Sequence, residues 1–148
     1  MYYSDEQWAA KEKWYKEKIN AIMIPKSVDS TVIYGLVSLI DEVMNSAFFD
    51  LSIAEYEYNT AYHAYQTRLS EAFLDAKNIE DKTSRGGTMS DEKAKRVAQV
   101  AVDKDGTLTD RLEKERRKEF MRNVVSLLQE KRSLLTISYG LSKMESGV

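Results

Sequence analysis

A stretch of 29 residues without glycine or proline, from Arg111 to Tyr139, is the feature that most limits how this chain can fold. Apolar residues recur along it and just beyond it in steps of four, three, seven and seven, the spacing with which packed helices meet. A helix from Asp110 to Lys143 would be about 50 Å long at 1.5 Å per residue, too long for a compact domain of this size unless other subunits pack against it. The sequence therefore predicts a long C-terminal helix used for oligomerisation. Its expected contact residues are Phe120, Val124, Leu127, Leu128, Leu134 and Leu141.

The rest of the chain also has few residues that interrupt helices, since its 148 residues include one proline and six glycines. A sandwich or barrel has many turns and would need more of both. We therefore expect an all-α fold, and a single helical domain over residues 1–148 because this length supports one ordinary core. The expected parts are an N-terminal amphipathic helix (1–24), a helical hairpin (29–77), a flexible loop (78–90) and a basic and apolar helical arm (91–143).

Local signals place the ends of these helices. The sequence from Ser4 to Gln7 is typical of a capping box, in which the Ser4 side chain accepts from the Gln7 N–H and the Gln7 side chain reaches back. Pro25 ends the first helix because proline lacks an N–H. The second helix of the hairpin is expected to begin near Ser52, and a further capping-box-like start near Thr88 opens the arm.

The net charge of −2 hides an uneven distribution of charge. Residues 1–92 hold 9 Lys and Arg against 16 Asp and Glu, a balance of −7, whereas residues 93–132 hold 12 against 7, a balance of +5. Such a segment suits either a polyanion or the acidic half of a neighbouring subunit. The candidate DNA-binding residues are Arg68, Arg85, Lys93, Lys95, Arg96, Arg111, Lys114, Arg116, Arg117, Lys118 and Arg122.

Acidic residues such as Glu113 and Glu119 alternate with these cations and supply partners three and four residues away. In one copy of the chain this pattern favours a solvated, salt-bridged helix. In a ring of copies the Arg116-Arg117-Lys118 cluster would repeat around an axis, and many weak phosphate contacts would add up to a salt-sensitive affinity.

One short motif is similar to an enzyme motif. Residues 100–110, VAVDKDGTLTD, resemble the first motif of the haloacid-dehalogenase-like phosphatases, in which Asp103 would be the nucleophile and Asp105 the general acid. That chemistry also needs a parallel sheet and further acids, but the 38 residues that follow Asp110 predict one helix. The alternative is a junction between helices, capped by Thr107 or Thr109. We expect no enzymatic activity, no catalytic residue, no metal site and no cofactor.

Other functional signals are few. The chain has no cysteine, so it has neither disulfides nor a thiolate metal site, and its one histidine, His63, is expected on a helix surface. No apolar run approaches the roughly 18 residues of a membrane span, and the start MYYSDEQW is unlike a signal peptide. We expect a soluble cytoplasmic protein.

Short motifs follow one another in a recognisable layout. Asp29-Ser30-Thr31 precedes a helix, Thr67-Arg68-Leu69 precedes a polar loop with Arg85-Gly86, Asp103-Lys104-Asp105 follows a mixed helix, and Lys131-Arg132 lies late in the last helix. This layout resembles the UvsY-type recombination mediators of phages. The resemblance implies ring formation, binding of single-stranded DNA, and loading of a RecA-like recombinase in place of single-strand-binding protein. It also implies DNA binding by basic residues before the loop, although Gln66 stands where that family has a Lys.

We therefore expect a non-enzymatic, homo-oligomeric mediator that binds single-stranded DNA, located in the cytoplasm of a host cell if a phage encodes it. A helical protein–protein adaptor or inhibitor, such as a phage anti-defence or virion-assembly factor, is the alternative. It would bind a protein partner without salt-dependent affinity for DNA. A phosphatase that uses Asp103 is the third hypothesis.

Overall fold

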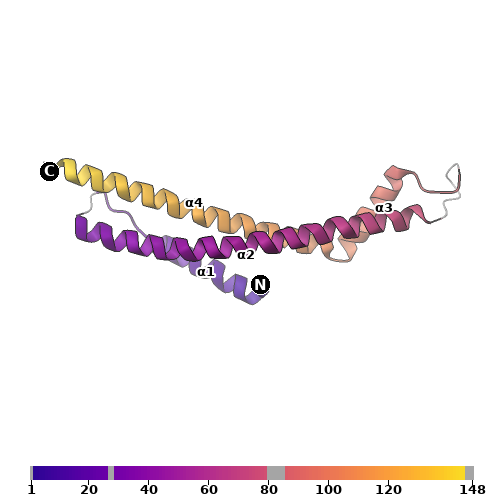
Figure 1. The fold of residues 1–148 in the computed structure, drawn as a ribbon, viewed down its shortest axis with the longest axis horizontal. Coiled ribbons are helices and arrows are strands. Elements are labelled where there is room, and N and C mark those ends of the chain that lie inside the picture. The colour runs from indigo at the N-terminus through magenta and orange to yellow at the C-terminus, as the bar shows by residue number, and fades with distance from the viewer. Residues whose placement is uncertain (1, 27–28, 80–85, 146–148) are drawn as a thin grey trace. The chain divides into compact units, whose positions relative to one another are not determined.

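The computed structural model of the chain describes residues 2–26, 29–79 and 86–145 and contains four α-helices and no strand in those ranges (Figure 1). The all-α fold and the long C-terminal helix predicted from the sequence are confirmed. The helices are α1 (Asp5–Ala21), α2 (Ser30–Lys77), α3 (Asp91–Lys104) and α4 (Thr107–Glu145). The chain divides into two compact units, unit 1 (Met1–Ala54 with Arg117–Val148) and unit 2 (Glu55–Arg116).

The predicted helical hairpin over residues 29–77 is wrong, because α2 is one continuous helix of 48 residues. The sequence has no glycine or proline near Ser52, where the break was expected. The Ser52 hydroxyl instead donates to the Phe48 carbonyl one turn earlier, a bond made inside a helix. The neighbouring Asp50 is buried and accepts from α1, so it does not cap a new helix.

The capping box predicted at the start of α1 is confirmed. The Gln7 N–H donates to Ser4 Oγ at 3.1 Å, and the Ser4 N–H donates to Gln7 Oε1 at 2.8 Å. The helix ends at Ala21, where Ile22 adopts an extended conformation three residues before Pro25. Both ends of α1 therefore follow from local sequence.

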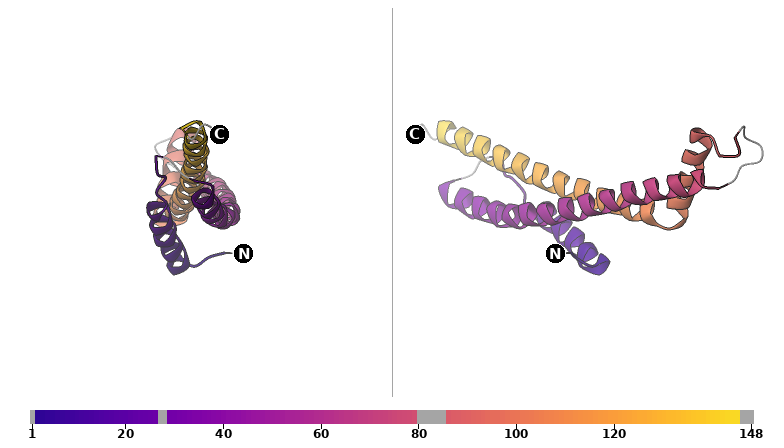
Figure 2. Two further views of the ribbon diagram at one scale, coloured as in Figure 1. Left: turned by 90° about the vertical axis from the view of Figure 1, so that its left-hand side faces the viewer. Right: turned by 45° about the vertical axis from the view of Figure 1, so that its right-hand side comes forward.

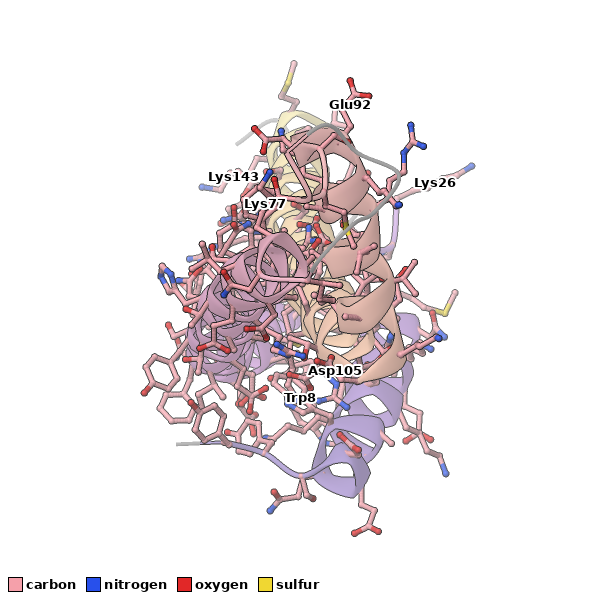
Figure 3. All side chains as sticks on the ribbon, turned by 90° about the vertical axis from the view of Figure 1, so that its right-hand side faces the viewer. Trp8, Lys26, Lys77, Glu92, Asp105 and Lys143 are labelled. Carbon is pink, nitrogen blue, oxygen red and sulfur yellow. The ribbon has the colours of Figure 1, made fainter. Side chains whose placement is uncertain are left out.

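The core of unit 1 is formed by large side chains from three helices. Trp8 and Tyr15 of α1, Ile40 of α2, and Leu128 and Leu135 of α4 are each at most 1% exposed and belong to one cluster. Burial of an apolar side chain of this size contributes about 1.5–3 kcal/mol. Within this unit the first part of α2 and the last part of α4 run side by side in both views of Figure 2, and Trp8 lies among the helices in Figure 3.

In unit 2, α3 packs on the last part of α2 through small side chains. Ala94, Ala98 and Val102 recur every four residues, are almost fully buried, and contact two clusters that contain Tyr65 and Ala76. Alanines at this spacing allow two helices to approach closely. The start of α3 differs from the prediction near Thr88, because the cap is Ser90, whose side chain accepts from the Lys93 N–H. Residues 80–85 of the loop predicted as flexible (78–90) lie outside the described residues.

The phosphatase-like motif is a junction between α3 and α4. Its Val100–Asp103 part is helical, so no strand leads into the aspartates. Gly106 turns the chain with φ at 83°, a left-handed conformation that favours glycine. Asp105 accepts from both the N–H (3.0 Å) and the hydroxyl of Thr107. The prediction that Thr107 or Thr109 caps α4 is therefore corrected: Thr107 is the donor and Asp105 the acceptor.

One helix of the described chain, α2, is long and apolar enough to cross a membrane, with mean hydropathy 1.4 over its most apolar 18-residue window. Core helices of soluble proteins pass the same test of length and composition but are mostly buried, whereas 22% of this window is buried.

Candidate nucleic-acid interface

Most of the predicted DNA-binding cations on α2 and α4 are engaged by acidic side chains. Arg68 donates to Asp105 at 2.8 Å, the shortest Arg116–Glu113 contact is 2.8 Å, and further pairs join Lys114 to Asp110 and Arg122 to Glu119. Arg85 lies outside the described residues. These pairs place a carboxylate beside each cation and so reduce its attraction for phosphate. They also agree with the solvated, salt-bridged helix expected for one copy.

Arg117 lies inside unit 1 and not on its surface. Its side chain is buried, donates to Asp5 Oδ1 at 2.6 Å, and lies 5.9 Å from the Trp8 ring. Its neighbour Lys118 keeps only 12% of its side chain exposed. Successive residues of a helix point to different sides, so the Arg116-Arg117-Lys118 cluster is not one exposed patch on this chain.

Arg111 has a similar structural role in unit 2. Its guanidinium carbon lies 4.9 Å from the Tyr65 ring and 5.6 Å from the Tyr62 ring. Such a cation–π contact holds the planar group against α2. Among the predicted DNA-binding residues, Arg117 is therefore buried, and Arg111 is partly buried against tyrosine rings of α2.

The outer face of α3 differs from the other basic segments. Lys93, Arg96 and Lys104 are exposed on it and surround Val97 and Val100, which are 36% and 50% exposed. These residues lie opposite the buried stripe of alanines, since a helix repeats every 3.6 residues. Lys95 is also exposed, although it lies closer to α2.

Few acids compete for these cations. Between described residues, no hydrogen bond or ion pair engages the side chains of Lys95, Arg96 or Lys104. Asp103 accepts from Gln99 on the same helix, and Glu92 projects outward from its first turn (Figure 3). The α3 outer face, defined by Lys93, Arg96, Val97, Val100 and Lys104, thus carries exposed cations in unit 2, and two of them, Arg96 and Lys104, have no partner among the described residues.

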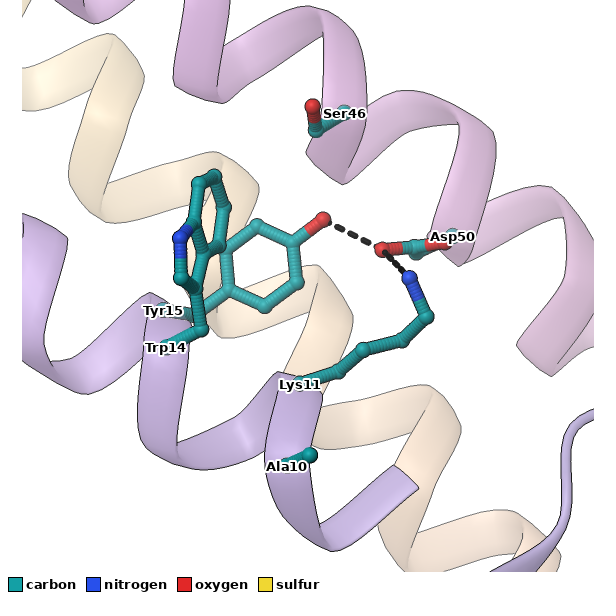
Figure 4. Close-up of a pocket in the computed structure, with 6 residues that line it drawn as sticks. All are labelled: Ala10, Lys11, Trp14, Tyr15, Ser46 and Asp50. Atoms are coloured by element: carbon teal, nitrogen blue, oxygen red, sulfur yellow. Dashed lines mark hydrogen bonds and ion pairs between the residues drawn. The ribbon is translucent and has the colours of Figure 1, made fainter. Parts of the chain in front are cut away.

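A second candidate lies in unit 1, where α1 crosses α2 (Figure 4). A cavity of about 390 Å³ there is lined by Ala10, Lys11, Trp14, Tyr15, Ser46 and Asp50. We call it the Trp14 pocket. None of its residues was predicted as a site from the sequence, although Trp14 lies between Lys11 and Lys18 on one helix face, a pattern that suits nucleic acid.

Asp50 forms the polar floor of the Trp14 pocket. It is 3% exposed and accepts from the hydroxyls of Tyr3 (2.8 Å) and Tyr15 (2.5 Å) and from Lys11 Nζ (3.2 Å). Burial, followed by the bond to Asp50, raises the pKa of Tyr15 far above its ordinary value. The Tyr15 hydroxyl therefore remains protonated and keeps donating to the carboxylate. This network fixes α1 on α2 and gives the pocket a rigid wall.

The predicted oligomerisation residues divide between two faces of α4. Val124 and Leu128 are buried in unit 1, and Phe120 is partly buried against the same core. Leu127, Leu134 and Leu141 are 44–48% exposed on the opposite face. Ile137 and Met144, which the prediction did not include, share that face at 58% and 77% exposure.

Outside these surfaces, the described part of the chain has few groups that could bind a metal ion or act in catalysis. No group of three or more His, Asp or Glu residues there could hold a metal ion. His63 is exposed on α2, as the sequence suggested.

Comparison with known proteins yields no relative. No protein-family model matches this chain, and no curated protein or solved structure is significantly similar to it. The resemblance to UvsY-type mediators therefore rests on sequence layout.

Proposed function

We propose that this protein is a non-enzymatic, self-associating helical protein that binds single-stranded DNA and serves as a recombination mediator for a RecA-like recombinase. The observation that carries the proposal is the α3 outer face, where exposed cations surround exposed apolar side chains. Proteins that bind single strands without sequence preference place cations along the phosphate backbone, and the exposed cations of this face would serve that purpose.

One copy of this face supplies few phosphate contacts, so its affinity is expected to be weak. Self-association would repeat the face and raise the overall affinity by linking several weak contacts. The exposed stripe of α4, with Leu127, Leu134 and Leu141 at heptad spacing, supports self-association because large exposed apolar stripes are usually covered by a partner. DNA binding and assembly are thus assigned to different helices.

DNA binding is tested by fluorescence anisotropy with a labelled single-stranded oligonucleotide at two salt concentrations. The double variant Arg96→Glu/Lys104→Glu should weaken binding at least tenfold and flatten its salt dependence, because each lost phosphate contact lowers the salt slope by about one. The control Lys13→Glu/Lys26→Glu makes the same change in net charge at exposed positions of unit 1, where Lys26 points outward in Figure 3. An equal loss in both variants would remove the α3 site and leave only a general effect of charge.

The mediator role needs a separate assay. Assembly of a RecA-like recombinase on DNA coated with single-strand-binding protein shows a lag, and a mediator shortens it. We expect the wild-type protein to shorten the lag and the α3 double variant to lose this effect. DNA binding without any change in the lag would keep the binding function and discard the mediator role.

A protein–protein adaptor or inhibitor is the second candidate, and the outer side of α2 favours it. Tyr34, Phe48 and Phe49 are 44–74% exposed in unit 1. Large exposed aromatic residues are typical of protein interfaces. A stable complex with a protein partner, together with no salt-dependent affinity for DNA, would support this function over the mediator.

A further inference from the structure

We propose that the Trp14 pocket binds one nucleobase of a single strand, with the base stacked on the Trp14 indole. The inference rests on the proposed binding of single-stranded DNA and adds a second contact in unit 1, away from the cations predicted from the sequence. The ligand is an unpaired nucleotide, because both faces of a paired base inside a duplex are covered by neighbouring bases.

The indole is placed for stacking. Trp14 is 37% exposed, and its ring is held edge to face against Tyr15 at a centroid distance of 4.9 Å. Tyr15 is itself fixed by its hydrogen bond to Asp50, as Figure 4 shows. A ring that is both exposed and rigid loses little freedom when a base stacks on it.

Cations lie on both sides of the indole along α1. Lys18 Nζ lies over the Trp14 ring at 5.7 Å from its centroid, and Lys11, whose ammonium pairs with Asp50, lines the pocket one turn before Trp14. Residues 11, 14 and 18 share one helix face, since they are separated by three and four positions. A nucleotide whose base stacks on the indole would carry its phosphate to the level of the Lys18 ammonium group.

The size and polarity of the pocket also suit a base. A cavity of about 390 Å³ lies at the lower end of the range for small-molecule sites, roughly 300–1,000 Å³. The Ser46 hydroxyl and the Asp50 carboxylate present polar atoms to the edge of a flat ligand. Asp50 has about four acceptor directions and uses three of them for Tyr3, Tyr15 and Lys11, which leaves one for an N–H of the base.

The two tryptophans allow a direct test by fluorescence. Trp8 is 1% exposed, so contact between DNA and Trp14 is the event that should quench emission. Titration of the wild-type chain with a single-stranded oligonucleotide should quench its fluorescence, and inorganic phosphate alone should not. Trp14→Phe should keep the oligonucleotide affinity within about threefold while losing the quenching, because phenylalanine still stacks.

Affinity changes test the pocket independently of the reporter. Trp14→Ala should lower oligonucleotide affinity by roughly 5- to 100-fold, the range for losing one stacked base. Ser46→Phe, which fills the pocket and leaves Trp14 in place, should have a similar effect. Tyr34→Ala removes an exposed aromatic residue that lies outside the pocket and should leave affinity unchanged. Circular dichroism checks that each variant is folded.

The outcomes separate this inference from the proposed function. Oligonucleotide binding that is unquenched and insensitive to Trp14→Ala and Ser46→Phe would overturn the pocket assignment and leave the α3 face standing. Quenching by inorganic phosphate alone would overturn base stacking. No oligonucleotide binding by the wild-type chain at all would overturn both proposals.

Discussion

At the scale of single residues, the buried carboxylate of Asp50 is expected to contribute more to the stability of the fold than an exposed ion pair does. Three donors from α1 and the segment before it converge on its carboxylate, and two of them are tyrosine hydroxyls. Removing an acceptor leaves buried donors without a partner, which costs about 1–3 kcal/mol. Asp50 therefore both holds α1 against α2 and lines the Trp14 pocket.

We predict that Asp50→Ala lowers the free energy of unfolding by about 1–3 kcal/mol, because Tyr15 is fully buried and loses its acceptor. Urea unfolding followed by circular dichroism measures this change. Asp41→Ala is the matched control, since Asp41 forms an exposed ion pair with Arg132 at 2.6 Å and such pairs contribute about 0–1 kcal/mol. Equal losses in the two variants would contradict the special role of Asp50.

Asp105 makes stability depend on pH in unit 2. Hydrogen bonds from the Thr107 hydroxyl and N–H, followed by the bond from Arg68, lower the pKa of Asp105 to about 2. An unfolded aspartate has a pKa of about 3.9, so the charged form stabilises the folded state above that pH and stops doing so as pH falls through about 2.

We predict that Asp105→Asn lowers Tm at pH 7, and that the difference from wild type shrinks below about pH 4 and disappears near pH 2. Thermal unfolding over a pH series measures this difference. Asp103→Asn, two residues away, should change Tm little at pH 7 because Asp103 is exposed and, among the described residues, accepts only from Gln99 within α3. A Tm difference for Asp105→Asn that stays constant with pH would contradict the prediction.

At the scale of elements, the continuity of α2 is the main departure from what the sequence indicated. Ser52 and Asp50 are residue types that often cap helices, so a break there was a reasonable local interpretation. The acceptor role of Asp50 depends on Tyr15 and Lys11, which are 35 and 39 residues away, and no local pattern reveals such partners. Tertiary contacts have therefore overridden a local signal.

We predict that Ser52→Pro destabilises the protein by about 3 kcal/mol or more, because proline inside a helix removes a hydrogen bond and clashes with the previous turn. Ser30→Pro is the control, since Ser30 is the first residue of α2 and proline is tolerated there. Chemical unfolding of both variants distinguishes the continuous helix from a hairpin. Under a hairpin with a second helix that starts near Ser52, both substitutions would be mild.

Element ends and surface charges differ in how far the sequence predicts them. The capping box at Ser4 and the junction at Gly106 depend on residues within three or four positions, and both were visible in the sequence. The burial of Arg117 depends on Asp5, 112 residues away, so an arginine that looked exposed became part of the interior. The Trp14 pocket likewise needs Asp50 from another helix.

At the scale of the whole molecule, the apolar residues of α4 form two surfaces, one in the core and one exposed. Their spacing in the sequence does not distinguish the two. Residues seven apart return to nearly the same face of a helix, and residues on the opposite face also recur with that spacing. In unit 1, Leu128 and Leu135 face the core, whereas Leu134 and Leu141 face outward. The inward residues are covered by side chains of this chain. The outward residues form the surface that a second copy would cover.

We predict that the double variant Leu134→Glu/Leu141→Glu lowers the mass in solution while its unfolding free energy stays within about 0.5 kcal/mol of wild type at each site, because both side chains are nearly half exposed. Leu128→Ala should have the opposite effects: a loss of about 2–5 kcal/mol from the core and an unchanged mass while folded. Light scattering and urea unfolding of the same samples measure the two quantities. A wild-type monomer at micromolar concentration would contradict self-association itself, and an unchanged mass of the glutamate variant would move the contact to another face. In the case of a wild-type monomer the α3 face would act as a single copy, and a flatter salt dependence of DNA binding should follow from its fewer phosphate contacts.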